Sequence, residues 1–365
     1  MNTLKPKILI ISGPTAIGKS EISIALAHKF NAEIISADSM QIYRKMNIGT
    51  GKLTKDEMQG IKHHLIDVVD FDEKYSVAQF IQDAILAIEQ ILPRNKNVMI
   101  VGGTGLYLNA LIHSYSLSGA QGDEKIREKY QQIAEKDGGE KLYQLLQTQD
   151  PDSAKKISPN DTRRVIRALE IFELTGLPKS TVAANNENIP YDFLQIVLEE
   201  ERSKLYSHIN RRVDNMIAKG LEKEVLSLYQ KASHCDTRSD FICLQGQNRA
   251  AVKGIKPRSS AAEHTAESGG VRGIAPKFNT LYKNMSSSSA IQSLQAIGYK
   301  EFIEYFNNRI SFEDTVAKIK QHSRNYAKRQ ITFFKWMKSN KIFIHRENET
   351  EIEQIAQAHL MKGKS

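Results

Sequence analysis

The sequence has very little cysteine and tryptophan: of its 365 residues, two are cysteine and one is tryptophan. Cys235 and Cys243 are too few for the disulfide framework of a small secreted protein, and they do not form the paired spacing of a zinc site. We therefore expect a reducing, cytoplasmic location, and we interpret both residues as incidental thiols.

Long apolar runs are also missing. No stretch approaches the roughly 20 apolar residues that a membrane-spanning helix needs, and the run Ile8–Ile11 is too short for the core of a signal peptide. We expect no membrane partner. Hydrophobic residues nevertheless make up 40% of the chain, which is enough for a packed core. The length suggests two domains, or one domain with a large insertion.

Acidic residues are absent from the segment 316–346, although the whole chain carries a formal charge of only +9. A basic segment of this kind indicates contact with a phosphate backbone, but it is also typical of a solvated helix face. The segment's basic residues are Lys318, Lys320, Arg324, Lys328, Arg329, Lys335, Lys338, Lys341 and Arg346.

The first 120 residues alternate between apolar strands and helices. Strands are predicted at Lys7–Ser12, Glu33–Ser36 and Val98–Val101, and helices at Ser20–Phe30 and Val77–Leu92. Because the strands are apolar on both faces, the pattern predicts an α/β core whose parallel sheet is covered by helices.

Later segments read mostly as helices, at Asp161–Leu174, Ser203–Gly220, Leu221–Lys231 and Phe312–Trp336, with one late run, Tyr191–Leu198, that could return to the sheet. We expect an α/β core over 1–120 and a helical insertion over 121–190. Residues 191–231 and 291–345 would return to the core and form a C-terminal helical region. The stretch 232–290 lacks periodicity and predicts a low-complexity, disordered insertion, and 346–365 a C-terminal tail.

The residues Gly13-Pro14-Thr15-Ala16-Ile17-Gly18-Lys19-Ser20 fit the phosphate-binding pattern G-x-x-x-x-G-K-[ST], between a predicted strand and a predicted helix. In such a loop several backbone N–H groups point into one concavity, and the helix start adds its positive end. Lys19 can reach a phosphate and Ser20 can ligate magnesium. The alternative is a glycine turn without a ligand.

The ends of the next two strands narrow the choice of chemistry. A typical nucleoside triphosphatase ends a hydrophobic strand with a metal-binding aspartate, but Val98–Val101 runs into Gly102–Tyr107 without an acid. Asp38, at the end of the second strand, lies where open α/β sheets bind ligands and could accept a proton. A capping role for Asp38 is the alternative.

Four segments together resemble the tRNA dimethylallyltransferase family: Gly13–Ser20, Asp38–Arg44 (DSMQIYR), Gly102–Tyr107 (GGTGLY) and Ala327–Trp336 (AKRQITFFKW). Asn160–Ile171, Arg211–Val225 and Gln295–Glu301 are similar to the family's middle segments. The resemblance covers most of residues 7–231 and 291–336. The long stretch 232–290 departs from the family, as does Lys62, where a proline is usual.

The resemblance implies a P-loop NTPase-like parallel-sheet core with an inserted or appended helical tRNA-binding subdomain. It implies transfer of a dimethylallyl group from dimethylallyl diphosphate to the exocyclic amine of the adenosine 3′ to the anticodon. The loop Gly13–Ser20 would bind the diphosphate, with Mg²⁺ on Ser20. Lys19, Asp38 and Thr104 would be catalytic, Asp38 as the proton acceptor.

The resemblance also implies a monomer that binds the anticodon stem-loop of tRNA. The implied tRNA-binding residues are Asp38, Ser39, Met40, Gln41, Thr104, Arg127, Arg163, Arg164, Val165, Ile166, Arg167, Gln295, Ala296, Ile297, Gly298, Tyr299, Lys300, Lys328, Arg329, Gln330, Ile331, Thr332, Phe333, Phe334 and Lys335.

Three other functions remain open from the sequence: prenyl transfer to free adenylate, a P-loop kinase of a small metabolite, and a non-catalytic RNA-binding relative. Three features favour structural roles. His63-His64 with Asp67 is unlike a metal site because adjacent side chains point apart. Glu199–Arg202 is expected to be a solvated turn. The aromatic residues among the basic ones, Tyr326, Phe333, Phe334 and Trp336, fit a helix core better than base stacking.

Overall fold

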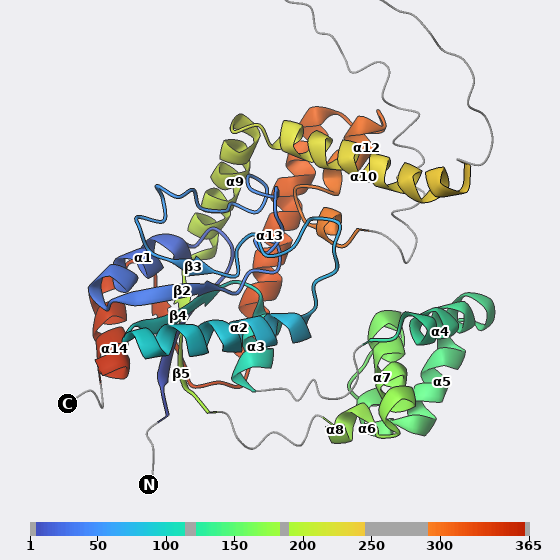
Figure 1. Ribbon diagram of the computed structural model, residues 1–365, viewed down its shortest axis with the longest axis horizontal. Helices are drawn as coiled ribbons and strands as arrows, with labels where there is room; N and C mark the ends of the chain where they lie inside the picture. The colour runs from blue at the N-terminus through green and yellow to red at the C-terminus, as the bar shows by residue number, and fades with distance from the viewer. Residues whose placement is uncertain (1–4, 114–121, 183–189, 245–290, 362–365) are drawn as a thin grey trace, which may run out of the picture.

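The computed structural model describes residues 5–113, 122–182, 190–244 and 291–361. Within these residues the chain forms one sheet with helices on both faces and, to one side, a separate group of helices (Figure 1). No helix of the described part is long and apolar enough to cross a membrane.

Every pairing in the six-stranded sheet is parallel, which confirms the α/β prediction. The strand order is β3 (His63–His64), β2 (Ala32–Ser36), β4 (Asn97–Gly102), β1 (Lys7–Ser12), β5 (Asp192–Glu199) and β6 (Lys341–His345). The late run 191–198 does return to the sheet, as β5 beside β1. The carboxyl ends of the parallel strands therefore meet at one edge, where this architecture binds ligands.

Alternate residues of each central strand enter two different cores. On one face Ile8, Ile10 and Ile100 pack with α2 (Val77–Ile91) and α3 (Gly105–Ile112). On the other face their neighbours pack with α1 (Lys19–Lys29) and α14 (Glu349–Met361). A strand buried on both faces explains the continuous apolar runs of the sequence.

Two long helices extend from the sheet edge, α9 (Arg202–Ala218) and α13 (Phe312–Trp336). Figure 1 shows them rising together from the sheet toward α10 (Leu221–Leu244) and α12 (Glu301–Phe306). A short turn, η2 (Ser293–Gln295), leads into α12. The α/β core and the C-terminal helical region therefore share one hydrophobic core.

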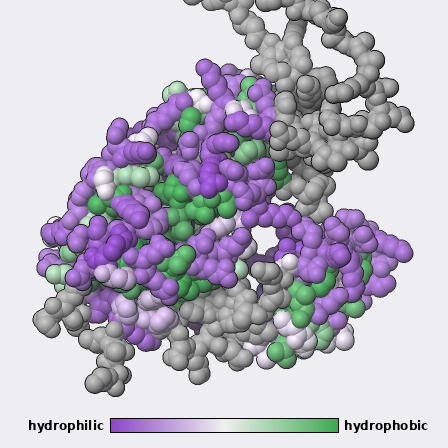
Figure 2. Space-filling model, in the orientation of Figure 1, coloured by the Kyte–Doolittle hydropathy of each residue, from purple (hydrophilic) through white to green (hydrophobic). Residues whose placement is uncertain are grey.

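The remaining helices form a small group with its own core. They are α4 (Glu124–Asp137), α5 (Gly139–Gln149), α6 (Pro151–Ala154), α7 (Thr162–Thr175) and α8 (Lys179–Val182). Leu142, Leu146 and Leu169 are fully buried within it. Figure 2 shows this group as a separate, mostly hydrophilic body beside the larger part, with apolar residues on its lower side.

Several boundaries differ from those expected. Helix α10 continues to Leu244, into the stretch predicted to lack structure, while residues 245–290 lie outside the described part of the chain. The expected C-terminal tail contains α14, whose Ile352, Ala356 and Leu360 are buried against the sheet. The prediction of a tail was wrong because a short amphipathic helix at a chain end carries a weak periodic signal.

Candidate active site

The loop from Gly13 to Ser20 joins β1 to α1, the placement that the phosphate-binding pattern requires. Gly18, with φ of +91°, and Ala16, with φ of +64°, take left-handed backbone conformations just before the helix starts. The Lys19 ammonium donates to the carbonyls of Gly13, at 3.0 Å, and Pro14, at 2.8 Å. The lysine thus lies across the concavity of its own loop.

Burial and the neighbouring guanidinium of Arg212 together lower the pKa of Lys19 to about 7, although Asp38 opposes the shift. An ammonium with such a pKa gains from an anionic neighbour, because opposite charge favours the protonated form. Two neighbouring cationic side chains, Lys19 and Arg212, would therefore be stabilised by a phosphate group bound between them.

Arg212, on α9, is a site residue that the sequence interpretation missed. Its guanidinium donates to the hydroxyl of Thr15, at 3.2 Å, and to the carbonyl of Thr50, at 3.0 Å. Burial lowers its pKa and Asp38 raises it. Its segment had been compared with the family, but only the folded chain brings this side chain over the loop.

Asp38 lies two residues after β2, and its neighbour Ser39 contacts Thr104, which lies two residues after β4. One carboxylate oxygen of Asp38 accepts the N–H groups of Met40, at 2.8 Å, and Gln41, at 3.3 Å. The Thr104 hydroxyl accepts the N–H of Ser39, at 3.0 Å. The helix-capping role weighed for Asp38 was wrong, because the described chain forms no helix between β2 and β3. The two bonds instead close a local turn, and both use only Oδ1.

Helix α13 closes the site through Gln330 and Tyr326. The buried Gln330 amide accepts the N–H of Thr15, at 2.9 Å, and donates to the carbonyl of Gly103, at 2.8 Å. Burial and Asp38 raise the pKa of Tyr326 to about 12, although its hydrogen bonds with Thr104 and Gln330 oppose the shift. The tyrosine is therefore a neutral phenol at neutral pH.

Two cavities meet at Asp38. The larger, about 850 Å³, is lined by the phosphate loop and by cations that include Lys19, Lys52 and Arg212. The smaller, about 320 Å³, is lined by Asp38, by the cations Arg212, Lys300 and Arg329, and by the apolar residues Met40, Ile209, Val213, Met216, Ile297 and Ile319. A ligand with a charged end and an apolar end would place its junction beside Asp38.

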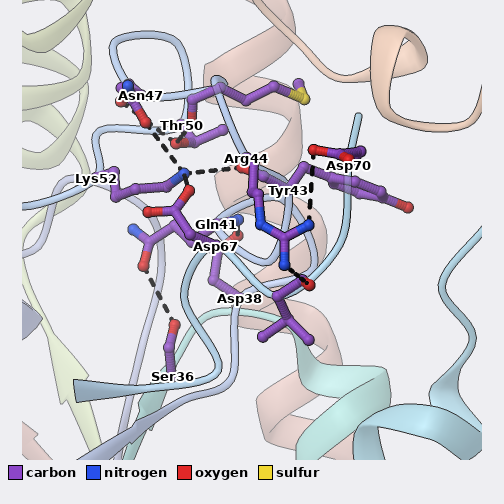
Figure 3. Close-up of polar contacts among 12 residues, drawn as sticks. Ser36, Asp38, Gln41, Tyr43, Arg44, Asn47, Thr50, Lys52, Asp67 and Asp70 are labelled. Atoms are coloured by element: carbon purple, nitrogen blue, oxygen red, sulfur yellow. Dashed lines mark hydrogen bonds and ion pairs between the residues drawn. The ribbon is translucent and has the colours of Figure 1, made fainter. Parts of the chain in front are cut away.

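The loop between β2 and β3 forms one wall of these cavities and is fixed from inside. The ammonium of Lys52, whose side chain is 5% exposed, donates to Asp67 at 2.6 Å, to the Tyr43 carbonyl at 2.8 Å and to Asn47 at 3.2 Å (Figure 3). Arg44 binds the Val68 carbonyl nearby. Lys52 is thus held by its loop.

A divalent metal has suitable oxygen donors at the start of α1. A cavity of about 50 Å³ is lined by Ser20, Ser36, Asp38 and Gln41. Magnesium prefers oxygen ligands and usually takes only one or two from the protein, with the rest from phosphate and water. The described residues contain no cluster of three or more histidine, cysteine or acidic side chains that would form a complete protein site. The oxygen donors present therefore fit a hard divalent cation that takes its remaining ligands from phosphate and water.

The helical group presents only part of its expected tRNA-binding set. Arg163 and Arg164 are exposed on α7, whereas Val165 and Ile166 are buried in the local core. Arg127 lies 2.8 Å, and Arg167 2.5 Å, from the fully buried carboxylate of Glu170. These two arginines neutralise the buried Glu170 carboxylate, so each has a structural role. Any contact with RNA would have to be made while this ion pair is kept.

The expected C-terminal set divides in the same way. Tyr299 and Phe334 are fully buried, and Gln330 is bonded to the phosphate loop, so a side-chain contact with RNA does not fit these three. Gln295, Ala296, Ile297, Gly298 and Lys300 line the smaller cavity together with Ser39, Met40 and Arg329. Lys328, Thr332, Phe333 and Lys335 are exposed on α13, and Ile331 is half-buried.

Several cations of the basic segment 316–346 are already paired. Lys318 lies 2.5 Å from Glu304, and Lys320 lies 2.6 Å from Asp214. Lys341 donates to the last carbonyls of α13. Lys328 lies over the ring of Tyr206, 5.9 Å from its centroid, on an open face. The segment itself contains no acidic residue, but acidic residues elsewhere in the chain neutralise part of its positive charge. The sequence alone therefore overestimates the charge that is available to RNA.

The features expected to be structural are only partly so. The helix-core interpretation was wrong for Trp336, which is 83% exposed, and for Phe333, which is 38% exposed. His64 lies 2.7 Å from the buried Glu33, whose pKa is lowered to about 2, against the effect of burial, by Arg94 and His64. The expectation of a solvated turn at Glu199–Arg202 was wrong for Glu200, whose side chain is 1% exposed and receives His345 at 3.1 Å.

Comparison with known proteins gives consistent results. The family model described as IPP transferase matches residues 41–256 and 270–337. A tRNA dimethylallyltransferase of Caldanaerobacter subterraneus subsp. tengcongensis is 41% identical over 90% of this chain and 89% of its own length. A tRNA dimethylallyltransferase of a Thermoanaerobacter strain is 39% identical over the same shares.

Solved structures agree with these sequence relatives. A full-length tRNA isopentenylpyrophosphate transferase of Bacillus halodurans is 35% identical, with a TM-score of 0.61, over 98% of both chains. A eukaryotic dimethylallyltransferase, described as acting on tRNA, has a TM-score of 0.71 and 29% identity over 97% of this chain and 78% of its own.

Proposed function

The chain belongs to the IPP transferase family, and from this premise we propose that it transfers a dimethylallyl group from dimethylallyl diphosphate to tRNA. The acceptor we propose is the exocyclic amine of the adenosine that follows the anticodon on its 3′ side. The observation that carries the proposal is the position of Asp38 in the lining of two cavities, a cationic one at the loop Gly13–Ser20 and a smaller one whose lining includes apolar residues of α9.

The donor fits this division. Its diphosphate would lie in the loop Gly13–Ser20, where Lys19 and Arg212 supply positive charge, and its five-carbon chain would extend toward the apolar residues of α9. Breaking the allylic carbon–oxygen bond leaves the bonding electrons on the departing diphosphate. Fixed cations around that group stabilise the charge as it develops, which lowers the barrier. A magnesium ion held with Ser20 would supply further charge neutralisation there.

The acceptor amine is a weak nucleophile because its lone pair is delocalised into the adenine ring. Positioning and a proton acceptor therefore matter more than strong activation. In the proposed reaction the amine nitrogen bonds to the allylic carbon, the carbon–oxygen bond breaks, and the amine proton passes to Asp38. Met40 and Gln41 hold the carboxylate in place through its Oδ1 atom.

Recognition of tRNA is supported by exposed cations at two places, Arg163 and Arg164 on α7 and Lys328 and Lys335 on α13. The target base must leave its stack to reach Asp38, and the cavity lined by the segment 295–300 offers a place for it. We propose that these surfaces hold the anticodon stem-loop. We further propose that the protein acts as a cytoplasmic monomer, with Mg²⁺ as its metal.

An assay with competing acceptors tests the proposal. Purified protein is incubated with labelled dimethylallyl diphosphate, magnesium and either unmodified tRNA or AMP, and the nucleosides are analysed. Label in one adenosine beside the anticodon supports the proposal. Transfer to AMP alone would identify an enzyme of free nucleotides, and consumption of ATP with phosphorylation of a metabolite would identify a kinase.

A further inference from the structure

We propose that Arg346, which follows β6, is an additional ligand for the donor's diphosphate on the outer side of the phosphate loop. The inference rests on the proposed function, because it concerns the same bound group. It adds a cation from the far end of the chain to those supplied by the loop and by α9.

Arg346 lies directly against the phosphate loop. A Cβ atom placed on Gly18 would stand 3.3 Å from the central carbon and from both terminal nitrogens of the Arg346 guanidinium. The planar group therefore packs flat on the loop backbone, just before α1 begins. It also lines the cationic cavity together with Lys19 and Ser20.

The sheet fixes this placement. Strand β6 pairs with β5 as far as the register Glu199↔His345, and the next N–H, that of Arg346, donates to the Glu199 carbonyl at 3.0 Å. The buried carboxylate of Glu200 receives His345 at 3.1 Å and lies 3.9 Å from the Arg346 Nε. The end of one edge strand thus delivers the arginine to the loop.

The Arg346 guanidinium lies near two carboxylates, but neither is close enough to accept a hydrogen bond from it. The nearest carboxylates to its guanidinium are Glu200, at 3.9 Å, and Glu21, at 4.0 Å, and the Glu21 side chain is 81% exposed. Both distances exceed that of a hydrogen bond. A guanidinium has five N–H donors in a fork that matches phosphate oxygens. The Arg346 side chain is 25% exposed, so a phosphate in the cavity can reach these donors.

The geometry favours the donor's diphosphate over an RNA phosphate. Arg346 shares its cavity with the phosphate loop, and that cavity is not lined by the exposed α13 residues Lys328 and Lys335. A cation stacked on Gly18 would meet the oxygens of a diphosphate that the loop's N–H groups bind. Loss of a charge-assisted, forked contact of this kind weakens anion binding by about tenfold, since such contacts are about twice as strong as neutral ones.

Calorimetric titration with inorganic pyrophosphate and magnesium tests this role. Arg346→Gln is compared with the wild type, with Arg346→Lys, which keeps a point charge without the fork, and with Arg202→Gln, an exposed cation at the start of α9. We expect the pyrophosphate Kd to rise about tenfold in Arg346→Gln, less in Arg346→Lys, and to be unchanged in Arg202→Gln. The Kd for tRNA should stay the same in all four proteins.

Each other outcome overturns the inference in a distinguishable way. Unchanged pyrophosphate affinity in Arg346→Gln, with the wild type binding normally, would remove Arg346 from the site and leave the proposed function intact. Weaker tRNA binding with unchanged pyrophosphate affinity would assign Arg346 to the RNA. A wild type that binds no pyrophosphate would contradict the proposed function itself. Circular dichroism checks that the variants are folded, and Arg346→Lys preserves the charge beside Glu200.

Discussion

Gln330 accepts a hydrogen bond from the backbone N–H of Thr15 at 2.9 Å, across 315 positions of the chain. The same amide donates to the Gly103 carbonyl, so one side chain of α13 joins the phosphate loop to the segment that follows β4. The partners also fix the orientation of the amide, since the N–H needs its oxygen and the carbonyl its nitrogen. The helix that carries the exposed cations is thereby connected to the donor site.

Removal of this amide should cost both stability and donor binding. In Gln330→Ala the Thr15 N–H and the Gly103 carbonyl lose their partner, so the free energy of unfolding should fall by about 1–3 kcal/mol. The KM for dimethylallyl diphosphate should rise as the loop loses its support. Urea denaturation and steady-state kinetics measure both effects. Thr332→Ala, on the exposed face of α13, should change the stability by less than about 0.5 kcal/mol. Equal effects in the two variants would argue against the role of Gln330.

The role of Asp38 can be separated from its structural bonds. Asp38→Asn keeps an oxygen to accept the N–H groups of Met40 and Gln41, but it cannot take up a proton. We expect kcat to fall by about 10²–10⁴-fold, the usual contribution of a general base, with tRNA and pyrophosphate affinities nearly unchanged. Single-turnover kinetics and separate binding titrations test this. A matching loss of tRNA affinity would mean that Asp38 binds the substrate rather than receiving its proton.

Two lysines of α13 form a matched pair for testing tRNA contact. Lys328 is exposed, whereas Lys320 is bound to Asp214 at 2.6 Å. Lys328→Ala should weaken binding to all tRNAs and reduce the slope of log Kd against log salt by about 0.7–0.9, the value of one lost phosphate contact. Lys320→Ala should leave the slope nearly unchanged. Titrations at several salt concentrations give both slopes, and an unaltered slope in Lys328→Ala would count against the contact.

The lowered pKa of Lys19 predicts a pH dependence of donor binding. With a pKa of about 7 in the free protein, the Lys19 side chain is largely a neutral amine at pH 8. A bound diphosphate favours its protonated, charged form. Binding should therefore take up a proton above pH 7 and weaken as the pH rises, while below pH 7 Lys19 is already charged and adds no dependence. Calorimetry at pH 8 in buffers of different ionisation enthalpy measures the uptake. Pyrophosphate itself titrates, so the comparison is with Lys19→Met, which should take up fewer protons. Equal uptake in both would refute the prediction.

Much of the fold follows from local patterns. Strands β1, β2 and β4, and helix α13 with its bounds Phe312–Trp336, agree with the sequence prediction because each is a strong periodic or apolar run between clear breaks. Strand β6 (KIFIH) was missed because it is short and its residues are mostly half-buried at the sheet edge. Such a segment resembles a loop in the sequence.

The site was less predictable than the fold. The phosphate loop and Asp38 could be found because each belongs to a contiguous motif. Arg212 and Arg346 could not, since their function depends on α9 and β6 being placed beside the loop, hundreds of residues away from it in the case of Arg346. Conversely, Tyr299 and Phe334 entered the implied tRNA-binding set only because they lie within matching segments, and both side chains are fully buried. Phe334 lies on the buried face of α13, which agrees with the helix-core interpretation of this residue.

The most direct test is a crystal structure of the protein with magnesium and a non-hydrolysable analogue of dimethylallyl diphosphate. We predict the diphosphate in the loop Gly13–Ser20, the Lys19 ammonium turned from the Gly13 and Pro14 carbonyls toward it, and the allylic carbon facing Asp38. An analogue bound outside this loop, or one whose allylic carbon points away from Asp38, would contradict the account.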